Sequence, residues 1–127
     1  MEITGKVVSG KNHFSWVLKN IEGLWDLYKK KSGLSLFPGT LNIELDYEFS
    51  IPLNSVRIES YEYGGDVSAS FYPCTVDIYK GIIIRTDKNE SGKGAHSKFI
   101  IEIGAEVKLR EVLNLSDGDN ISIKINL

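Results

Sequence analysis

The sequence predicts a mainly β protein that folds as a closed or nearly closed β-barrel. Three observations lead to this prediction: several short segments alternate between apolar and polar residues, only one segment has a strong helical pattern, and strands and helices do not alternate along the chain. Closure would also remove exposed strand edges, which are a hazard for a small strand-rich protein. With 127 residues, the chain is expected to form one domain over residues 1–127.

Four elements are predicted in the first half of the chain. Residues 2–9 alternate well enough to predict a strand. Residues 20–31 predict the one substantial helix, because apolar residues recur there at the i, i+3, i+4, i+7 spacing of one helix face. That face consists of Ile21, Leu24, Trp25 and Tyr28. Residues 40–46 and 55–63 predict two further strands, and the glycines at 64–65 favour a hairpin turn after the second.

The second half of the chain is predicted to consist mainly of strands. These strands are expected over residues 74–78, 81–86, 99–103 and 121–125. In the first of them, Ile78 is expected to point inward with Cys74 and Val76. Residues 87–95 are polar and contain glycine, which predicts a surface loop, and residues 107–113 predict a short helix or helical turn.

Composition narrows the class of function. The single cysteine, Cys74, excludes an internal disulfide and a cysteine-based zinc site. No stretch approaches the roughly 20 apolar residues that a membrane crossing needs, and no signal peptide is recognisable, so we expect a cytoplasmic protein without a membrane partner. A net charge of −2 argues against general binding to nucleic acid.

Polar side chains in the strand after Pro38 suggest a cation site. Alternation places the Thr40 hydroxyl and the Asn42 amide on the same face, opposite the leucines of that strand. Two neutral oxygens side by side could hold Mg²⁺, which keeps several waters and takes other contacts from substrate phosphates. The alternative interpretation is a strand whose polar face meets solvent.

Two other segments carry groups suited to phosphate chemistry. Glu102 lies in an otherwise apolar strand; it either faces solvent or faces a pocket, where it could accept a hydrogen bond or act as a general base. Lys108 and Arg110 could place positive charge near phosphates, or could belong to a solvated helical turn. Residues 10–13, Gly-Lys-Asn-His, follow the first strand and fit a weak phosphate loop or an ordinary loop.

Taken together, these segments resemble the archaeal CTP-dependent riboflavin kinase family. The matching pieces are Gly5-Lys6-Val7-Val8-Ser9-Gly10, Pro38-Gly39-Thr40-Leu41-Asn42, Leu45-Asp46, His96, Ile101-Glu102-Ile103, Lys108-Leu109-Arg110-Glu111, Leu115 and Asp117-Gly118-Asp119. They occur in the family's order, at compatible spacings, over nearly the whole chain.

The resemblance implies a six-stranded cradle-loop barrel that transfers the γ-phosphate of CTP to the ribityl 5′-hydroxyl of riboflavin, giving FMN and CDP. It implies Mg²⁺ contacts at Thr40 and Asn42, flavin contacts at Gly94 and Glu102, and a catalytic role for Glu102. The nucleotide contacts that it implies are Gly10, Lys11, Asn12, His13, Val107, Lys108, Leu109 and Arg110.

The chain departs from the family pattern at two places, which leaves alternatives open. Residues 10–15 replace a glycine-rich Gly-x-Gly-Glu-Gly loop, and Gly94 stands where the family often has threonine. One alternative is therefore a barrel that binds a flavin or nucleotide without turnover. A second is a DNA-binding cradle-loop barrel, although the mild negative charge opposes it.

Overall fold

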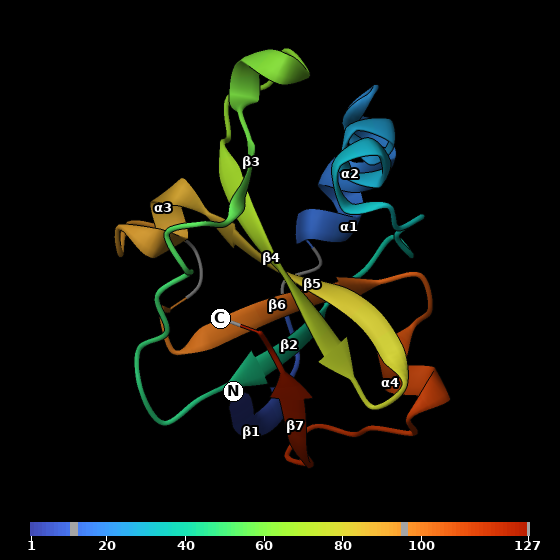
Figure 1. Cartoon of the computed structure of the whole chain (residues 1–127), viewed down its shortest axis with the longest axis vertical. Helices are drawn as coiled ribbons and strands as arrows, with labels where there is room; N and C mark the ends of the chain where they lie inside the picture. The colour runs from blue at the N-terminus through green and yellow to red at the C-terminus, as the bar shows by residue number, and fades with distance from the viewer. Residues whose placement is uncertain (11–12, 95–96, 127) are drawn as a thin grey trace.

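The computed structural model describes residues 1–10, 13–94 and 97–126, and its strands form one antiparallel sheet that closes on itself (Figure 1). The strands are β1 (Glu2–Val8), β2 (Leu41–Glu44), β3 (Val56–Ile58), β4 (Ala69–Val76), β5 (Tyr79–Thr86), β6 (Ile100–Ala105) and β7 (Asn120–Lys124). They follow the order β3-β4-β5-β6-β2-β1-β7, and β7 also pairs with β4. The predicted six-stranded barrel is confirmed, with β3 attached to β4 outside the ring.

Short helices surround the barrel. They are α1 (His13–Asn20), α2 (Leu24–Ser32), the 3₁₀ turn η1 (Ser60–Glu62), α3 (Asp87–Glu90) and α4 (Leu109–Val112). In Figure 1, α1 and α2 project from the same end of the barrel as the arm formed by β3 and η1. Among the described residues, no helix has both the length and the apolar composition needed to cross a membrane.

Two apolar clusters hold these parts together, and β4 and β5 contribute to both because their alternate residues point to opposite faces. The first cluster fills the barrel and includes Val7, Ile83 and Ile101, all fully buried. The second packs α1 and α2 against the outer face of the sheet, where Phe71 and Ile84 meet the helices. The helices therefore cover the part of the outer face of β4 and β5 around Phe71 and Ile84.

The prediction of a single substantial helix was incomplete, because α1, which has eight residues against nine in α2, precedes the predicted helix. The helix expected over residues 20–31 is α2, but it begins only at Leu24 because Gly23, with a φ of 82°, interrupts the chain after α1. The helical turn expected over residues 107–113 is α4. Within the loop predicted at 87–95, residues 87–90 instead form α3, which Thr86 caps by accepting a hydrogen bond from the Asn89 amide.

Two predictions for the strands were wrong. Ile78 does not point inward: its exposed fraction is 79%, because Asp77, with a φ of 54°, and Ile78 form the two-residue turn between β4 and β5. The segment 55–63 is not one strand, since β3 ends at Ile58 and η1 follows. The glycines at 64–65 therefore belong to a longer connection than a tight hairpin.

Candidate functional site

A row of four side chains crosses four neighbouring strands on the outer face of the barrel. Ile84 of β5 pairs with Glu102 of β6, Glu102 pairs with Asn42 of β2, and Asn42 pairs with Val8 of β1. Directly opposed residues of antiparallel strands project to the same face. The Glu102 carboxylate and the Asn42 amide are therefore neighbours. The alternation within each strand is compatible with this arrangement but does not determine which strands pair.

One end of this row opens into a cavity of about 370 Å³ between the sheet, the helices and the β3–η1 arm. We call it the apolar cavity, because hydrophobic side chains from five elements form most of its wall. Its lining residues are Phe14, Val17, Leu24, Tyr28, Ile58, Tyr63, Val67, Ala69, Ile84, Thr86, Lys88, Asn89, Lys93, Gly94 and Glu102. Such a cavity suits a flat, largely apolar ligand with a few polar groups.

The other end opens into a second cavity of about 470 Å³, which we call the polar cavity. Backbone and side chains of the β1 end, of residues 37–42 and of α4 form its wall. Its lining residues are Val8, Ser9, Gly10, Lys19, Phe37, Pro38, Gly39, Thr40, Leu41, Asn42, Ile103, Lys108, Leu109 and Arg110. Among the described residues of this wall are three cationic side chains and no carboxylate, which favours an anionic ligand such as a polyphosphate.

The two cavities meet at a hydrogen bond. The Thr40 hydroxyl, which lines the polar cavity, donates to Oε2 of Glu102, which lines the apolar cavity, over 3.2 Å. A group bound in one cavity and a group bound in the other would thus approach each other beside this pair. The arrangement can bring two different ligands into contact at one carboxylate.

Asn42 has the chemistry of a cation ligand. It is only 7% exposed, and its Oδ1 has no hydrogen-bond partner among the described residues. An unpaired buried acceptor is costly and calls for a partner that the protein itself does not supply. Thr40 adds a second neutral oxygen nearby. The described residues contain no cluster of three or more His, Cys, Asp or Glu side chains, so a cation here would need further oxygens from a ligand.

A polar network fixes the position of Arg110 at the edge of the polar cavity. Its guanidinium donates to Oδ1 of Asp117 over 2.7 Å and to the Val8 carbonyl over 3.2 Å. The Ser9 hydroxyl donates to the other Asp117 oxygen over 2.6 Å. These hydrogen bonds, from Ser9 and then Arg110, hold the pKa of Asp117 below its usual value. The carboxylate therefore stays charged and keeps the guanidinium beside the end of β1.

The remaining predicted residues fall into three groups. Gly94 lines the apolar cavity and Leu109 the polar cavity, whereas Val107 lines neither and packs against the barrel core. His13 begins α1. Outside the described residues lie Lys11, Asn12 and His96.

Sequence reasoning missed the part of the site that α1 contributes. Phe14 and Val17 line the apolar cavity and Lys19 lines the polar cavity. A signal was present, since Phe14, Val17, Leu18 and Ile21 recur at the spacing of one helix face. This pattern was not interpreted as a helix because residues 10–15 were compared with a phosphate-binding loop.

Two tyrosines complete the apolar cavity. Tyr28 packs its ring edge-on against Phe14, with ring centres 5.5 Å apart. Burial raises the pKa of Tyr28, and Tyr63 and Glu102 raise it further, so its hydroxyl stays protonated. The Tyr63 hydroxyl donates a hydrogen bond to the Val67 carbonyl. This bond links the residues just after η1 to the segment that leads into β4.

A family model and the sequences of similar proteins point to the same protein family. The model of a family named for CTP-dependent riboflavin kinases, described as a domain of unknown function (DUF120), matches residues 7–125. Proteins named riboflavin kinase from Pyrobaculum aerophilum, Pyrobaculum islandicum and Thermococcus kodakarensis are 30%, 33% and 30% identical to the chain. The alignments cover 100%, 100% and 97% of the chain but only 61%, 61% and 58% of those proteins. The chain thus spans about three fifths of the length of these relatives.

Proposed function

The chain belongs to the CTP-dependent riboflavin kinase family, and on this premise we propose that it transfers the γ-phosphate of CTP to the 5′-hydroxyl of riboflavin. FMN and CDP are the products. In this proposal riboflavin occupies the apolar cavity, CTP occupies the polar cavity, and the reaction takes place in the cytoplasm. The observation that carries the proposal is the hydrogen bond between Thr40 and Glu102 at the meeting point of the two cavities.

This geometry supports an in-line phosphoryl transfer. The isoalloxazine ring would pack between the helices and the sheet, so that the ribityl chain extends towards Glu102. The 5′-oxygen then forms a bond to the γ-phosphorus, and the bond from that phosphorus to its bridging oxygen breaks, leaving its electron pair on CDP. The hydroxyl proton passes to the Glu102 carboxylate and from there to solvent. Such a reaction depends mainly on positioning and on neutralising the phosphate oxygens.

The polar cavity would supply that neutralisation. Lys19 and Lys108 present ammonium groups, and Arg110 presents a guanidinium that Asp117 holds in place. We propose Thr40 and Asn42 as the protein contacts of Mg²⁺, since each offers a neutral oxygen beside the anionic ligand. When bound, Mg²⁺ would neutralise charge on the phosphate oxygens.

A nucleotide panel tests the proposal. The purified chain is incubated with riboflavin, Mg²⁺ and CTP, ATP, GTP or UTP in turn, and FMN is separated by chromatography. We expect FMN with CTP in preference to the other three. Binding of riboflavin without formation of FMN from any nucleotide would instead support a barrel that binds flavin and does not turn over.

A single substitution tests the role of the carboxylate. Glu102→Gln keeps the shape of the side chain and removes its basicity, so the rate should fall about 100-fold or more while riboflavin still binds. Glu44→Gln is the matched control, because Glu44 is an exposed carboxylate on β2 that lines neither cavity. Equal rates in the two variants would contradict the proposed proton acceptor.

A further inference from the structure

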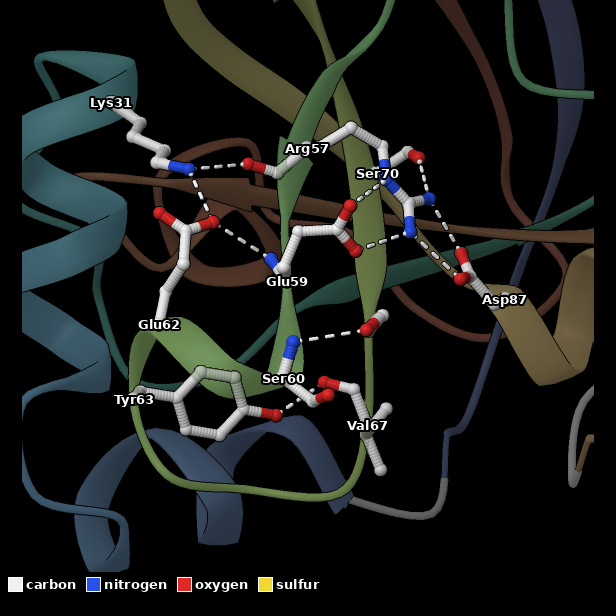
Figure 2. A network of polar contacts seen from close by, with 10 residues as sticks. Lys31, Arg57, Glu59, Ser60, Glu62, Tyr63, Val67, Ser70 and Asp87 are labelled. Atoms are coloured by element: carbon white, nitrogen blue, oxygen red, sulfur yellow. Dashed lines mark hydrogen bonds and ion pairs between the residues drawn. The ribbon is translucent and has the colours of Figure 1, made fainter.

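Arg57 of β3 uses every donor of its guanidinium. Nη1 donates to Ser70 and Asp87 over 2.8 and 2.7 Å, and Nη2 donates to Glu59 and Asp87, each over 2.8 Å. Nε donates to Glu59 over 3.4 Å. Figure 2 shows the Glu59 and Asp87 carboxylates on opposite sides of the guanidinium, each accepting hydrogen bonds through both oxygens. An ammonium group has only three donors in another geometry and cannot make this set of bonds.

The bonded groups lie directly behind the wall of the apolar cavity. Ile58 lines the cavity and Arg57, its neighbour on β3, points to the other face. Asp87 stands between two lining residues, Thr86 and Lys88, at the start of α3. Ser70, the β-partner of Arg57, follows the lining residue Ala69. One guanidinium thus joins three walls of the cavity: β3, β4 and the start of α3.

A second link extends the network to the helical wall. Lys31 of α2 donates to the Arg57 carbonyl over 2.7 Å and to Oε1 of Glu62 over 2.6 Å. The same Glu62 oxygen accepts a bond from the Glu59 amide over 2.9 Å. Tyr63, next to Glu62, lines the cavity. The network thus connects four of the elements that line the cavity, α2, β3, β4 and α3, through residues that do not themselves line it (Figure 2).

The exposure of this network shows what it can and cannot do. The Arg57 and Asp87 side chains are 41% and 51% exposed. Ion pairs this exposed contribute little to global stability, because solvent screens them. A saturated, bidentate guanidinium still fixes the relative positions of the segments it joins. The network is therefore suited mainly to setting the shape of the cavity, and it adds only a small part to the stability of the fold.

We propose that Arg57 is a positioning residue that sets the width of the apolar cavity, and thereby the affinity for the flavin. This inference rests on the proposed function for the identity of the ligand, whereas the mechanical part concerns the chain alone. Arg57 touches neither ligand: it acts through Ile58 and through the first turn of α3, which carries Lys88 and Asn89 into the cavity wall.

The test compares Arg57→Ala and Arg57→Lys with the wild type and with Lys80→Ala, which removes an exposed cation from β5 outside both cavities. Steady-state kinetics give the KM for riboflavin, the KM for CTP and kcat. Hydrogen exchange of the ligand-free chain follows the amides of residues 86–94. Both Arg57 variants should raise the KM for riboflavin about tenfold, change the KM for CTP less than about twofold, and speed exchange over residues 86–94.

Each outcome bears on the inference. Arg57→Lys with wild-type kinetics and exchange would show that charge alone suffices and would overturn the positioning role. Equal increases in both KM values, or exchange unchanged over residues 86–94, would also overturn it. If the wild type phosphorylates no riboflavin, the proposed function fails, but exchange in the ligand-free variants still decides whether Arg57 holds this wall.

Discussion

Gly10 determines where the Asn42 side chain can lie. A Cβ atom at position 10 would stand 2.1 Å from Nδ2 and 2.7 Å from Cγ of Asn42, distances that real contacts do not reach. Because Asn42 is buried in the row between Glu102 and Val8, its amide cannot swing out of the way freely. Glycine is needed here for space rather than for an unusual φ angle.

Substitutions at these two positions should therefore be coupled. Gly10→Ala should destabilise the chain by about 1–3 kcal/mol through overpacking. Asn42→Ala should change stability by less than about 1 kcal/mol, because it removes an unpaired buried oxygen, yet it should abolish most turnover. In the double variant the cost of Gly10→Ala should fall below about 0.5 kcal/mol. Urea denaturation and FMN formation measure the two effects.

The cycle has a clear contrary result. Additive losses in the double variant would mean that the Cβ at position 10 meets something other than the Asn42 amide. Near-normal turnover of Asn42→Ala at saturating Mg²⁺ would contradict the proposed cation contact.

At the residue scale, the sequence correctly predicted which side chains of the site share a face, but not how deeply each of them is buried. Alternation placed Thr40 and Asn42 on one face, and Glu102 on a possible pocket face. It gave no sign that Asn42 is buried while Glu44, on the same face, is exposed. Both residues pair with β1 and β6, but Gly10 lies directly against the Asn42 amide, and Asn42 also lines the polar cavity together with residues of α4. Contacts between segments distant in sequence, such as Gly10 and Asn42, cannot be deduced from the polar and apolar pattern of either segment alone.

At the scale of elements, glycine separates the two helices that wall the apolar cavity. Gly23 has a φ of 82°, and a Cβ added there would meet no atom within 4 Å. Any cost of substitution is therefore conformational and not steric crowding. The interruption turns α2 relative to α1, so that Phe14 and Tyr28 from different helices meet at the cavity.

Gly23→Ala should accordingly lower the free energy of unfolding by about 1–2 kcal/mol, the usual cost of a left-handed conformation for a residue with a side chain. Gly23→Asn should lower it less, because asparagine tolerates this region better. Urea denaturation of both variants checks the order. An alanine variant as stable as the wild type would mean that α2 can extend back through residue 23 towards residue 20, where the sequence pattern placed the start of the helix.

Short elements were the hardest to predict, for a physical reason. A helix of four residues such as α3 makes few hydrogen bonds of its own and depends on its cap and on tertiary contacts. The Thr86 cap lies beside a segment, residues 87–95, whose polar composition is equally typical of a loop. The alternating strands β1 and β7 were found because their burial pattern is local, whereas α3 is held by Arg57 from a distant strand.

At the scale of the whole molecule, the closed ring and the site depend on each other. Thr75 pairs with Lys124 where β4 meets β7, and this pairing closes the sheet into a barrel with a continuous outer surface. Two cavities can then lie next to each other along that face, each with its own helices and loops as walls. A row of four paired residues joins them, so residues far apart in sequence meet at Glu102.

Acidic pH should release the carboxylates that tie these outer segments to the barrel. Hydrogen bonds from Arg57 hold the pKa of Asp87 and of Glu59 below their usual values of 3.8 and 4.5. The bond from Lys31 does the same for the pKa of Glu62, and those from Ser9 and Arg110 for Asp117. A carboxylate whose pKa is lower in the folded than in the unfolded state stabilises the fold above the unfolded value, and this contribution disappears as pH falls through the folded value.

The free energy of unfolding should therefore show no loss from these four groups between pH 7 and about pH 5. Below about pH 4.5, where the unfolded chain binds more protons than the folded one, it should decrease by the small amount that such exposed pairs contribute. Urea denaturation from pH 7 to pH 3 measures the slope. In Arg57→Ala the slope should be shallower, because Asp87 and Glu59 then lose the largest cause of their lowered pKa values, whereas Lys80→Ala should keep the wild-type slope. A wild-type curve that stays flat below pH 4.5, or an Arg57→Ala curve as steep as the wild type, would show that these ion pairs do not link the outer walls to folding.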